Sequence, residues 1–154
     1  EQPHGQARFL ADALDELREL ARGIHPAILS DRGLMPAVES LASRLPIDVS
    51  VTAPEVSLPD AIEAALYYVV AESLTNVVRY ADTSDAAVSI DVTESAVVVV
   101  VADEGIGGAD PTRGSGLRGL QDRVSALDGR MWVESQPGGG TRVIAEIPLA
   151  TVTA

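Results

Sequence analysis

The amino-acid sequence predicts an α+β fold, a two-layer α/β sandwich in which helices cover one face of a mixed, mostly antiparallel sheet. From residue 47 onward, segments with strand and helix patterns follow in the order strand, helix, strand, strand, helix, strand, strand. Two pairs of strands are consecutive, which favours antiparallel hairpins and argues against a doubly wound parallel sheet. Residues 1–30 carry a helical pattern of their own and predict an N-terminal helical extension.

Two helices are predicted before the first strand. In residues 6–24, apolar side chains recur at steps of four and three, which is the narrow seam of a helix that pairs with another helix. Gly23 and Pro26 end this helix. Residues 31–45 predict a second, shorter helix. Its inward-facing residues are Leu34, Val38, Leu41 and Leu45.

The sheet is predicted to begin with a strand at residues 47–51, where apolar residues alternate. A long helix follows, because Ser57, Pro59 and Asp60 form a helix-start signal and the apolar pattern continues to about Ala81. The apolar stripe that is expected to lie on the sheet consists of Ile62, Leu66, Val69, Val70 and Val77.

Four strands and one helix are predicted in the second half of the chain. Residues 86–95 and 96–105 form a hairpin, and its second strand is apolar on both faces, so it is expected at the centre of the sheet. Residues 116–129 form a helix that a glycine closes. A last hairpin pairs residues 130–136 with residues 141–149.

The composition excludes several functional classes. The net charge is −12 with 11 arginines and no lysine, which argues against a nucleic-acid partner because phosphate neutralisation needs a basic face. The absence of cysteine excludes disulfides and cysteine chemistry. No apolar run reaches the roughly 20 residues that cross a bilayer, so direct membrane contact is not expected. An anionic ligand must be held by backbone amides, a metal ion or a few arginines.

Three polar residues interrupt the apolar pattern near the end of the long helix. In the stretch ESLTNVVRYA, Glu72, Asn76 and Arg79 recur at spacings of four and three, so they share one side of a helix. A solvated outer face is the simplest interpretation. Glu72 and Asn76 also form an oxygen-rich pair suited to Mg²⁺, which takes few protein oxygens together with water and phosphate.

Three glycine-rich segments follow. DEGIGG begins at Asp103, directly after the most apolar strand, and its glycines would allow close backbone approach at a pocket floor; an ordinary strand-to-loop turn is the alternative. GSGLRGL begins at Gly114 and enters a helix whose free amides attract anions. It lacks the acidic residue of a dinucleotide site and the lysine of a P-loop. PGGGT ends at Thr141 and fits a hairpin turn.

In this order, the segments closely resemble the ATP-binding catalytic domain of two-component sensor histidine kinases, within the ATPase superfamily shared with gyrase and Hsp90-like chaperones. ESLTNVVRYA is similar to the N box, DEGIG and GSGLRGL to the two glycine boxes, and GGGT to the last nucleotide-contacting turn. The upstream LRELARGIHPAILSDRGLMPAVESLA is similar to the segment that precedes this domain in the NarL-type subfamily. The resemblance covers about residues 47–149 and implies a Bergerat-type ATP-binding fold.

The resemblance implies catalytic and phosphate-binding roles for the helix residues. Asn76, supported by Glu72, would hold Mg²⁺ on the phosphates of ATP. Arg79 would reach the phosphates, and Tyr80 would line the sugar or phosphate side. An acid such as Glu72 also resembles the general base for water in the ATPase relatives, so hydrolysis is an alternative activity. The helix start that would meet the phosphates comprises Gly114, Gly116 and Leu117.

The resemblance implies a second group of residues around the adenine base. Asp103 would accept a hydrogen bond from the adenine amino group, and Thr141 would support the same end of the nucleotide. Gly105 and Gly107 would let the base lie against the backbone. Only residues 109–113 separate the two glycine boxes, which predicts a lid that covers ATP in part.

The resemblance also implies the organisation of the chain. Residues 1–30 would be the end of a dimerisation helix and its linker, residues 31–149 the ATP-binding domain, and residues 150–154 a tail. The phosphoacceptor of the subfamily is a histidine followed by an acid, a pattern that neither His4 nor His25 meets. The γ-phosphoryl group would therefore go to a histidine outside this chain, for relay to a response regulator. The full-length protein would be a homodimer, cytoplasmic in this part and with or without a membrane anchor.

Two other functions remain open from the sequence. A serine kinase that binds a sigma factor would use the same pocket, but the heptad prefix and the linker argue against it. A non-enzymatic partner-binding module would have a degenerate pocket, whereas Asn76, Asp103 and both glycine boxes are present.

Overall fold

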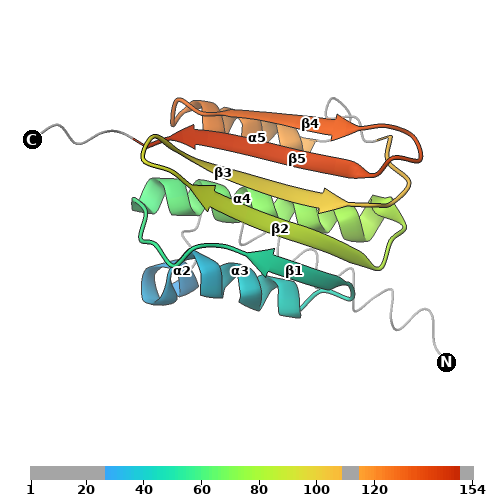
Figure 1. The fold of residues 1–154 in the computed structure, drawn as a ribbon, viewed down its shortest axis with the longest axis horizontal. Helices are drawn as coiled ribbons and strands as arrows, with labels where there is room; N and C mark the ends of the chain where they lie inside the picture. Colours follow the sequence, from blue (N-terminus) through green and yellow to red (C-terminus); the bar gives the residue numbers. More distant parts are fainter. Residues whose placement is uncertain (1–26, 109–114, 150–154) are drawn as a thin grey trace, which may run out of the picture.

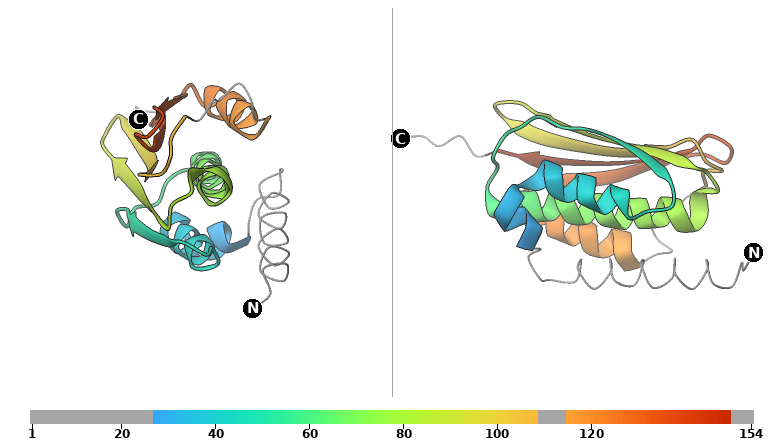
Figure 2. Two further views of the ribbon diagram at one scale, coloured as in Figure 1. Left: turned by 90° about the vertical axis from the view of Figure 1, so that its right-hand side faces the viewer. Right: turned by 90° about the horizontal axis from the view of Figure 1, so that it is seen from below.

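The computed structural model describes residues 27–108 and 115–149, and it has the predicted two-layer arrangement. Five strands form one sheet in the order β1-β2-β3-β5-β4. The described helices all lie on one face of that sheet, as the two further views confirm (Figures 1 and 2). The helix predicted at residues 6–24 and the tail at residues 150–154 lie outside the described residues. No helix in the described ranges combines the length and the hydropathy needed to cross a bilayer.

The sheet is mixed and mostly antiparallel, as predicted. β1 pairs with β2 in parallel, whereas β2 with β3, β3 with β5, and β4 with β5 are antiparallel. The two consecutive pairs are the hairpins expected from the sequence, and β3 is the central strand. The strands are β1 (Asp48–Thr52), β2 (Asp85–Val92), β3 (Ala96–Asp103), β4 (Arg130–Ser135) and β5 (Thr141–Pro148).

The helix-covered side of β3 passes from an apolar core to a polar end. Its alternate residues Val97, Val99 and Val101 are buried, and the next member of this series is Asp103, which is only 8% exposed. The register pairs Asp103 with Thr141 on β5. The residues of β3 that face the other side of the sheet are half-buried. The core therefore ends, at one edge of the molecule, in a layer of polar side chains.

The long central helix α4 (Asp60–Asn76) lies against the sheet and contacts both α3 and α5. Every residue from 62 to 71 is buried, and the apolar stripe predicted to face the sheet is buried throughout. The helical segment ends at Ala81, as predicted, but its last turn is the π-helix η1 (Val77–Ala81). Asp82 then takes a left-handed conformation, with φ of 53°.

Helix α4 starts at Asp60, but not through the predicted side-chain cap. No side chain caps its N-terminus at Pro59. Instead Glu63, which is 6% exposed, accepts a hydrogen bond of 3.2 Å from the backbone N–H of Leu58. This bond places a carboxylate in the first turn, where the helix dipole favours negative charge.

Replacing Glu63 tests this capping role. Glu63→Ala is expected to lower the free energy of unfolding by about 1–2 kcal/mol, because it removes the acceptor of the Leu58 N–H and the charge at the helix start. Glu63→Gln keeps an acceptor oxygen and is expected to lose less. Urea denaturation followed by circular dichroism measures both. Equal losses for the two variants would show that the bond to Leu58 contributes nothing.

The helix predicted at residues 31–45 begins only at Leu34, and a further short helix precedes it, mostly within the predicted linker, so that prediction was wrong in detail. α2 (Ala27–Arg32) and α3 (Leu34–Ser43) are separated by Gly33, whose φ of 88° suits a residue without a side chain. The residues predicted to face inward are nevertheless buried. The last helix, α5 (Ser115–Ser125), lies within the predicted range 116–129 apart from its first residue.

Candidate functional site

Three segments that are far apart in the sequence meet at one end of the sheet, at the right of Figure 1. The carbonyl oxygen of Ala81, at the end of η1, accepts a hydrogen bond of 2.8 Å from the N–H of Ile106. The carbonyl oxygen of Ile106 accepts a bond of 2.6 Å from the N–H of Gly138 in the β4–β5 turn. The N-box-like segment, the first glycine box and the GGGT turn are therefore held together by backbone hydrogen bonds.

Glycines make this close approach possible. A Cβ atom at Gly105 would fall on the carbonyl oxygen of Ala81, and one at Gly107 on that of Gln136. A Cβ at Gly140 would likewise fall on the carbonyl oxygen of Asp103. The resemblance implied that Gly105 and Gly107 make room for a base. In the structure, the space of their missing side chains is taken by the backbone of the chain itself.

Asp103 and Thr141 form the polar layer at this end. The Oδ1 atom of Asp103 accepts a hydrogen bond of 2.8 Å from the N–H of Gly105, which fixes the carboxylate at the start of the loop. No described donor is bonded to its Oδ2 atom. The hydroxyl of Thr141 lies 2.7 Å from the hydroxyl of Ser135. The two predicted adenine-side residues are thus adjacent across β3 and β5, with one carboxylate oxygen left for a ligand.

Helix α4 contributes Glu72 and Asn76, which are one turn apart and both half-buried. Arg79 and Tyr80 are exposed, and Tyr80 retains 64% of its accessible surface. The π-turn has more residues per turn than an α-helix, so the α-helical spacing that predicted a single stripe ends at Asn76. Wide turns of this kind are frequent at functional sites.

The segment predicted to meet the phosphates, at the start of α5, is described only in part. Gly114 and the lid at residues 109–113 lie outside the described residues. Gly116 belongs to the first turn of α5. The side chain of Leu117 is buried in the hydrophobic core, at 7% exposure.

The donor set fits a magnesium ion that is shared with phosphates. In the described ranges, no group of three or more His, Asp and Glu residues could hold a metal ion by itself. Glu72 and Asn76 offer two oxygen-bearing side chains on one helical turn, and Mg²⁺ commonly binds to one or two protein oxygens, with water and substrate phosphates as its other ligands.

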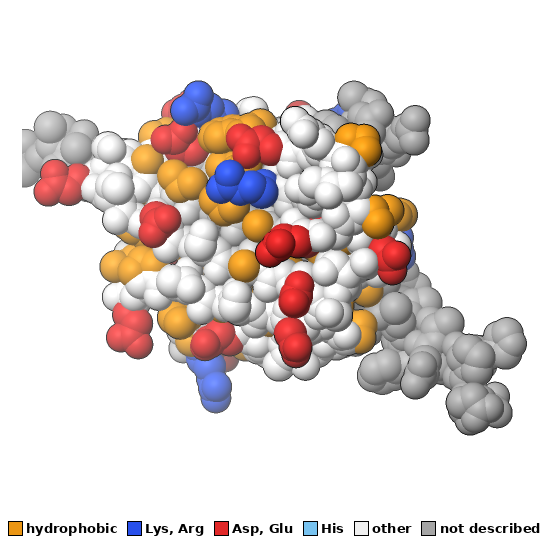
Figure 3. Space-filling view, turned by 45° about the vertical axis from the view of Figure 1, so that its right-hand side comes forward, with side chains coloured by type: hydrophobic (Ala, Val, Ile, Leu, Met, Phe, Trp, Pro, Cys, Tyr) orange, Lys and Arg blue, Asp and Glu red, His pale blue; other side chains and the backbone are white. Residues whose placement is uncertain are grey.

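Acidic side chains outnumber basic ones on the face of the molecule that includes this end (Figure 3). A phosphate chain would therefore be repelled by most of the surface. Binding would depend on local positive contributions from Arg79, from backbone amides and from a metal ion.

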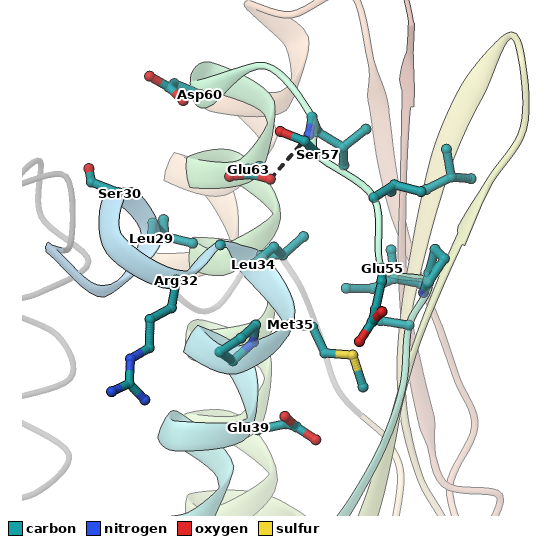
Figure 4. A pocket seen from close by; sticks show the side chains of 18 residues that line it. Leu29, Ser30, Arg32, Leu34, Met35, Glu39, Glu55, Ser57, Asp60 and Glu63 are labelled. Atoms are coloured by element: carbon teal, nitrogen blue, oxygen red, sulfur yellow. Dashed lines mark hydrogen bonds between the residues drawn. The ribbon is translucent and has the colours of Figure 1, made fainter.

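A cavity of about 660 Å³ lies at the opposite end of α4, where the sequence predicted no binding site (Figure 4). It is lined by parts of α2, α3, residues 53–58 and the first turn of α4. Among the described residues that line it, Arg32 is the one basic residue, against four acidic ones. A triphosphate would be repelled by this lining, so the cavity does not suit an anionic ligand. Its carboxylates belong to Glu39, Glu55, Asp60 and Glu63.

Sequence reasoning missed two residues at the polar end of the sheet and one buried hydroxyl on α4. The carbonyl of Ala81 has no sequence signal, because any residue supplies one. Gly140 was visible only as part of the GGGT turn. Ser73, a small polar residue within the apolar part of α4, is 2% exposed, and its Oγ atom has no hydrogen-bond partner in the described structure.

Comparisons with known proteins identify the family of the chain. Residues 61–151 match the family described as histidine kinase-, DNA gyrase B-, and HSP90-like ATPase. The oxygen sensor histidine kinase NreB of Staphylococcus carnosus is 30% identical over 151 residues, which are 92% of this chain and 44% of NreB. The sensor histidine kinase NarS of Mycobacterium tuberculosis is 35% identical over 91% of this chain and 35% of its own length. The chain thus spans less than half of either relative.

Solved structures confirm the fold. The histidine kinase domain of the blue-light activated histidine kinase from Erythrobacter litoralis superposes with a TM-score of 0.62 at 24% identity, covering 89% of this chain and 61% of that one. The histidine kinase AdeS of Acinetobacter baumannii gives a TM-score of 0.61 at 15% identity, covering 92% and 76%.

The family match covers more than half of the chain, and the relatives confirm the resemblance to NarL-type sensor histidine kinases that the sequence predicted. The chain belongs to the histidine kinase-, DNA gyrase B- and HSP90-like ATPase family.

Proposed function

We propose that the chain is the ATP-binding catalytic domain of a two-component sensor histidine kinase. It would bind Mg-ATP at the end of the sheet where η1, residues 103–107 and the β4–β5 turn meet. It would then present the γ-phosphoryl group to a histidine outside this chain. The observation that carries the proposal is the backbone linkage from Ala81 through Ile106 to Gly138, because it brings the three family motifs to one place.

Each described residue has a task that its position supports. Asp103 is buried, negatively charged and held by Gly105, so it can accept a hydrogen bond from the amino group of adenine and distinguish it from a carbonyl. Asn76 and Glu72 would orient the phosphate end through Mg²⁺, which supplies positive charge against the phosphates when bound. Arg79 is exposed in the following turn η1 and would add a direct contact. Positioning and charge neutralisation account for most of the catalysis of phosphoryl transfer.

The acceptor histidine, the partners and the location of the whole protein are part of the same proposal. NreB and NarS are named as sensor histidine kinases. By analogy, the full-length protein would dimerise through helices upstream of this domain and pass the phosphoryl group to a response regulator. The domain itself would work in the cytoplasm, with or without a membrane anchor elsewhere in the protein.

Phosphoryl transfer tests the proposal more sharply than binding alone. The chain is expected to bind Mg-ADP in calorimetry and to remain unlabelled with γ-³²P-ATP, because His4 is followed by glycine and His25 by proline rather than by an acid. Adding a separately produced dimerisation domain with the acceptor histidine should give label on that domain only. Label on His4 or His25 would contradict the assignment, and so would the absence of any nucleotide binding.

A further inference from the structure

The acidic cavity at the start of α4 contains a buried carboxylate that is bonded through only one of its oxygens. Glu63 is 6% exposed, and its Oε2 atom accepts the hydrogen bond from the N–H of Leu58. Among the described residues, no donor bonds to its Oε1 atom and no basic side chain pairs with it. The helix start compensates part of the negative charge. Because a buried carboxylate needs a cation or a full set of donors, the free oxygen indicates a cationic partner.

Two further carboxylates lie at the open side of the same cavity. Glu39 on α3 and Glu55 in the segment after β1 are exposed, and both side chains point into the space between α3 and that segment (Figure 4). The side chains of Arg32 and Asp60 point away from this space. The cavity therefore has one acidic group at its buried end and two at its mouth.

The arrangement of these carboxylates decides which kind of cation fits. In residues 27–108 and 115–149, no group of three or more Asp, Glu and His side chains could hold a metal ion. A ligand would instead need positive charges separated by an apolar chain, and ammonium groups joined by methylene units have this form. The volume of about 660 Å³ is within the range of small-molecule sites. The apolar walls comprise Leu29, Leu34, Met35, Leu58, Ile90 and Val92.

We propose that this cavity binds a small organic cation of the polyamine class. One ammonium group would donate to the free Oε1 atom of Glu63, a second would lie at Glu39 and Glu55, and the methylene chain would cover the apolar walls. The ligand would tie α3 and residues 53–58 to the first turn of α4. Since the cavity is at the opposite end of α4 from the proposed nucleotide site, the inference does not depend on the proposed function.

Titration of the nucleotide-free, ¹⁵N-labelled chain with spermidine tests the proposal. Sodium chloride at about 150 mM screens the general attraction of a polyamine to an acidic surface. Saturable amide shifts are expected at residues 29–39 and 53–63, with little change at residues 76–81 and 103–108. The melting temperature should rise with the spermidine concentration. Butylamine has a single ammonium group and should bind at least about tenfold more weakly. Shifts spread over the whole acidic surface, or none that saturate, would overturn the proposal.

Three variants test the carboxylates one end at a time. Glu63→Gln should lower the spermidine affinity about tenfold, because the amide still accepts the bond from Leu58 but no longer faces the ammonium group with a charge. The double variant Glu39→Gln/Glu55→Gln changes only exposed residues, leaves the bond to Leu58 intact, and should lower the affinity about fivefold.

Asp60→Asn is the matched control, since it removes the same charge from the first turn of α4 but its side chain points away from the cavity. Its spermidine affinity should equal that of the wild type. Calorimetry measures all three variants, and thermal unfolding confirms that each is folded. Wild-type affinity in the double variant would overturn the proposal, and so would equal losses for Glu63→Gln and Asp60→Asn.

Discussion

Asp103→Asn is expected to weaken Mg-ADP binding by about 100-fold, the largest effect of any single side-chain replacement at the site. The amide oxygen of asparagine can still accept the bond from the N–H of Gly105, so the loop keeps its anchor. Its NH₂ group then replaces the oxygen that would face the adenine amino group, and two donors oppose each other. Losing a charge-assisted bond in a buried site costs about 1.5–3 kcal/mol, which corresponds to a factor between about 10 and 150.

Glu104→Gln is the matched control for that measurement. Glu104 is the next residue, is exposed, and carries the same charge. Its neutralisation is expected to change the affinity less than twofold, because exposed charges are screened. Isothermal titration calorimetry measures both variants, and thermal unfolding confirms that each is folded. Equal affinity of Asp103→Asn and the wild type would remove Asp103 from the site.

Gly107→Ala is expected to be the most damaging change in the glycine-rich loop. The new Cβ would fall on the backbone carbonyl of Gln136, and the residue already has a left-handed φ of 68°. The backbone cannot give way without moving the β4–β5 turn. The overlap and the unfavourable φ should together cost about 2–4 kcal/mol of stability. Mg-ADP affinity should fall more than tenfold, because the loop after β3 is displaced from the turn.

A variant at the neighbouring Gly108 separates the effect of the overlap from the effect of the unfavourable φ. Its φ is 76°, close to that of Gly107, but a Cβ there would meet nothing within 4 Å. Gly108→Ala therefore has the same backbone penalty, about 1–2 kcal/mol, without the overlap. Urea denaturation gives the stabilities and calorimetry the affinities. If both variants lost the same stability and affinity, close packing of the loop against Gln136 would have no part in the site.

The sheet could be predicted from the sequence because its pattern is local. Each strand alternates or is continuously apolar, and the two consecutive pairs leave only short hairpin links. The central position of β3 followed from valines on both of its faces. The parallel pairing of β1 with β2 was not predicted, because no local pattern reports it.

The helices show where local reasoning fails. The break at Gly33 was missed because the apolar stripe begins only at Leu34, directly after the glycine, so the pattern did not report where the helix starts. The π-turn at residues 77–81 has no sequence signature, since VVRYA fits an α-helical pattern equally well. Its consequence is that Arg79 and Tyr80 do not continue the α-helical spacing of Glu72 and Asn76.

The site could be predicted as a set of residue types but not as a geometry. Asp103, Asn76 and the glycines were recognisable from their order in the chain. That Gly105 and Gly107 make room for other parts of the backbone depends on contacts between distant segments, which periodicity does not report. The unpaired hydroxyl of Ser73 is equally invisible, because serine in an apolar helix normally bonds to its own backbone.

The central claim is that one nucleotide site forms where η1, residues 103–107 and the β4–β5 turn meet. A titration of the ¹⁵N-labelled chain with Mg-ADP, followed through backbone amide resonances, tests it directly. The account predicts saturable shifts at residues 76–81, 103–108 and 138–141, with little change at residues 53–63 around the acidic cavity. Shifts concentrated at residues 53–63, or none that saturate, would contradict it.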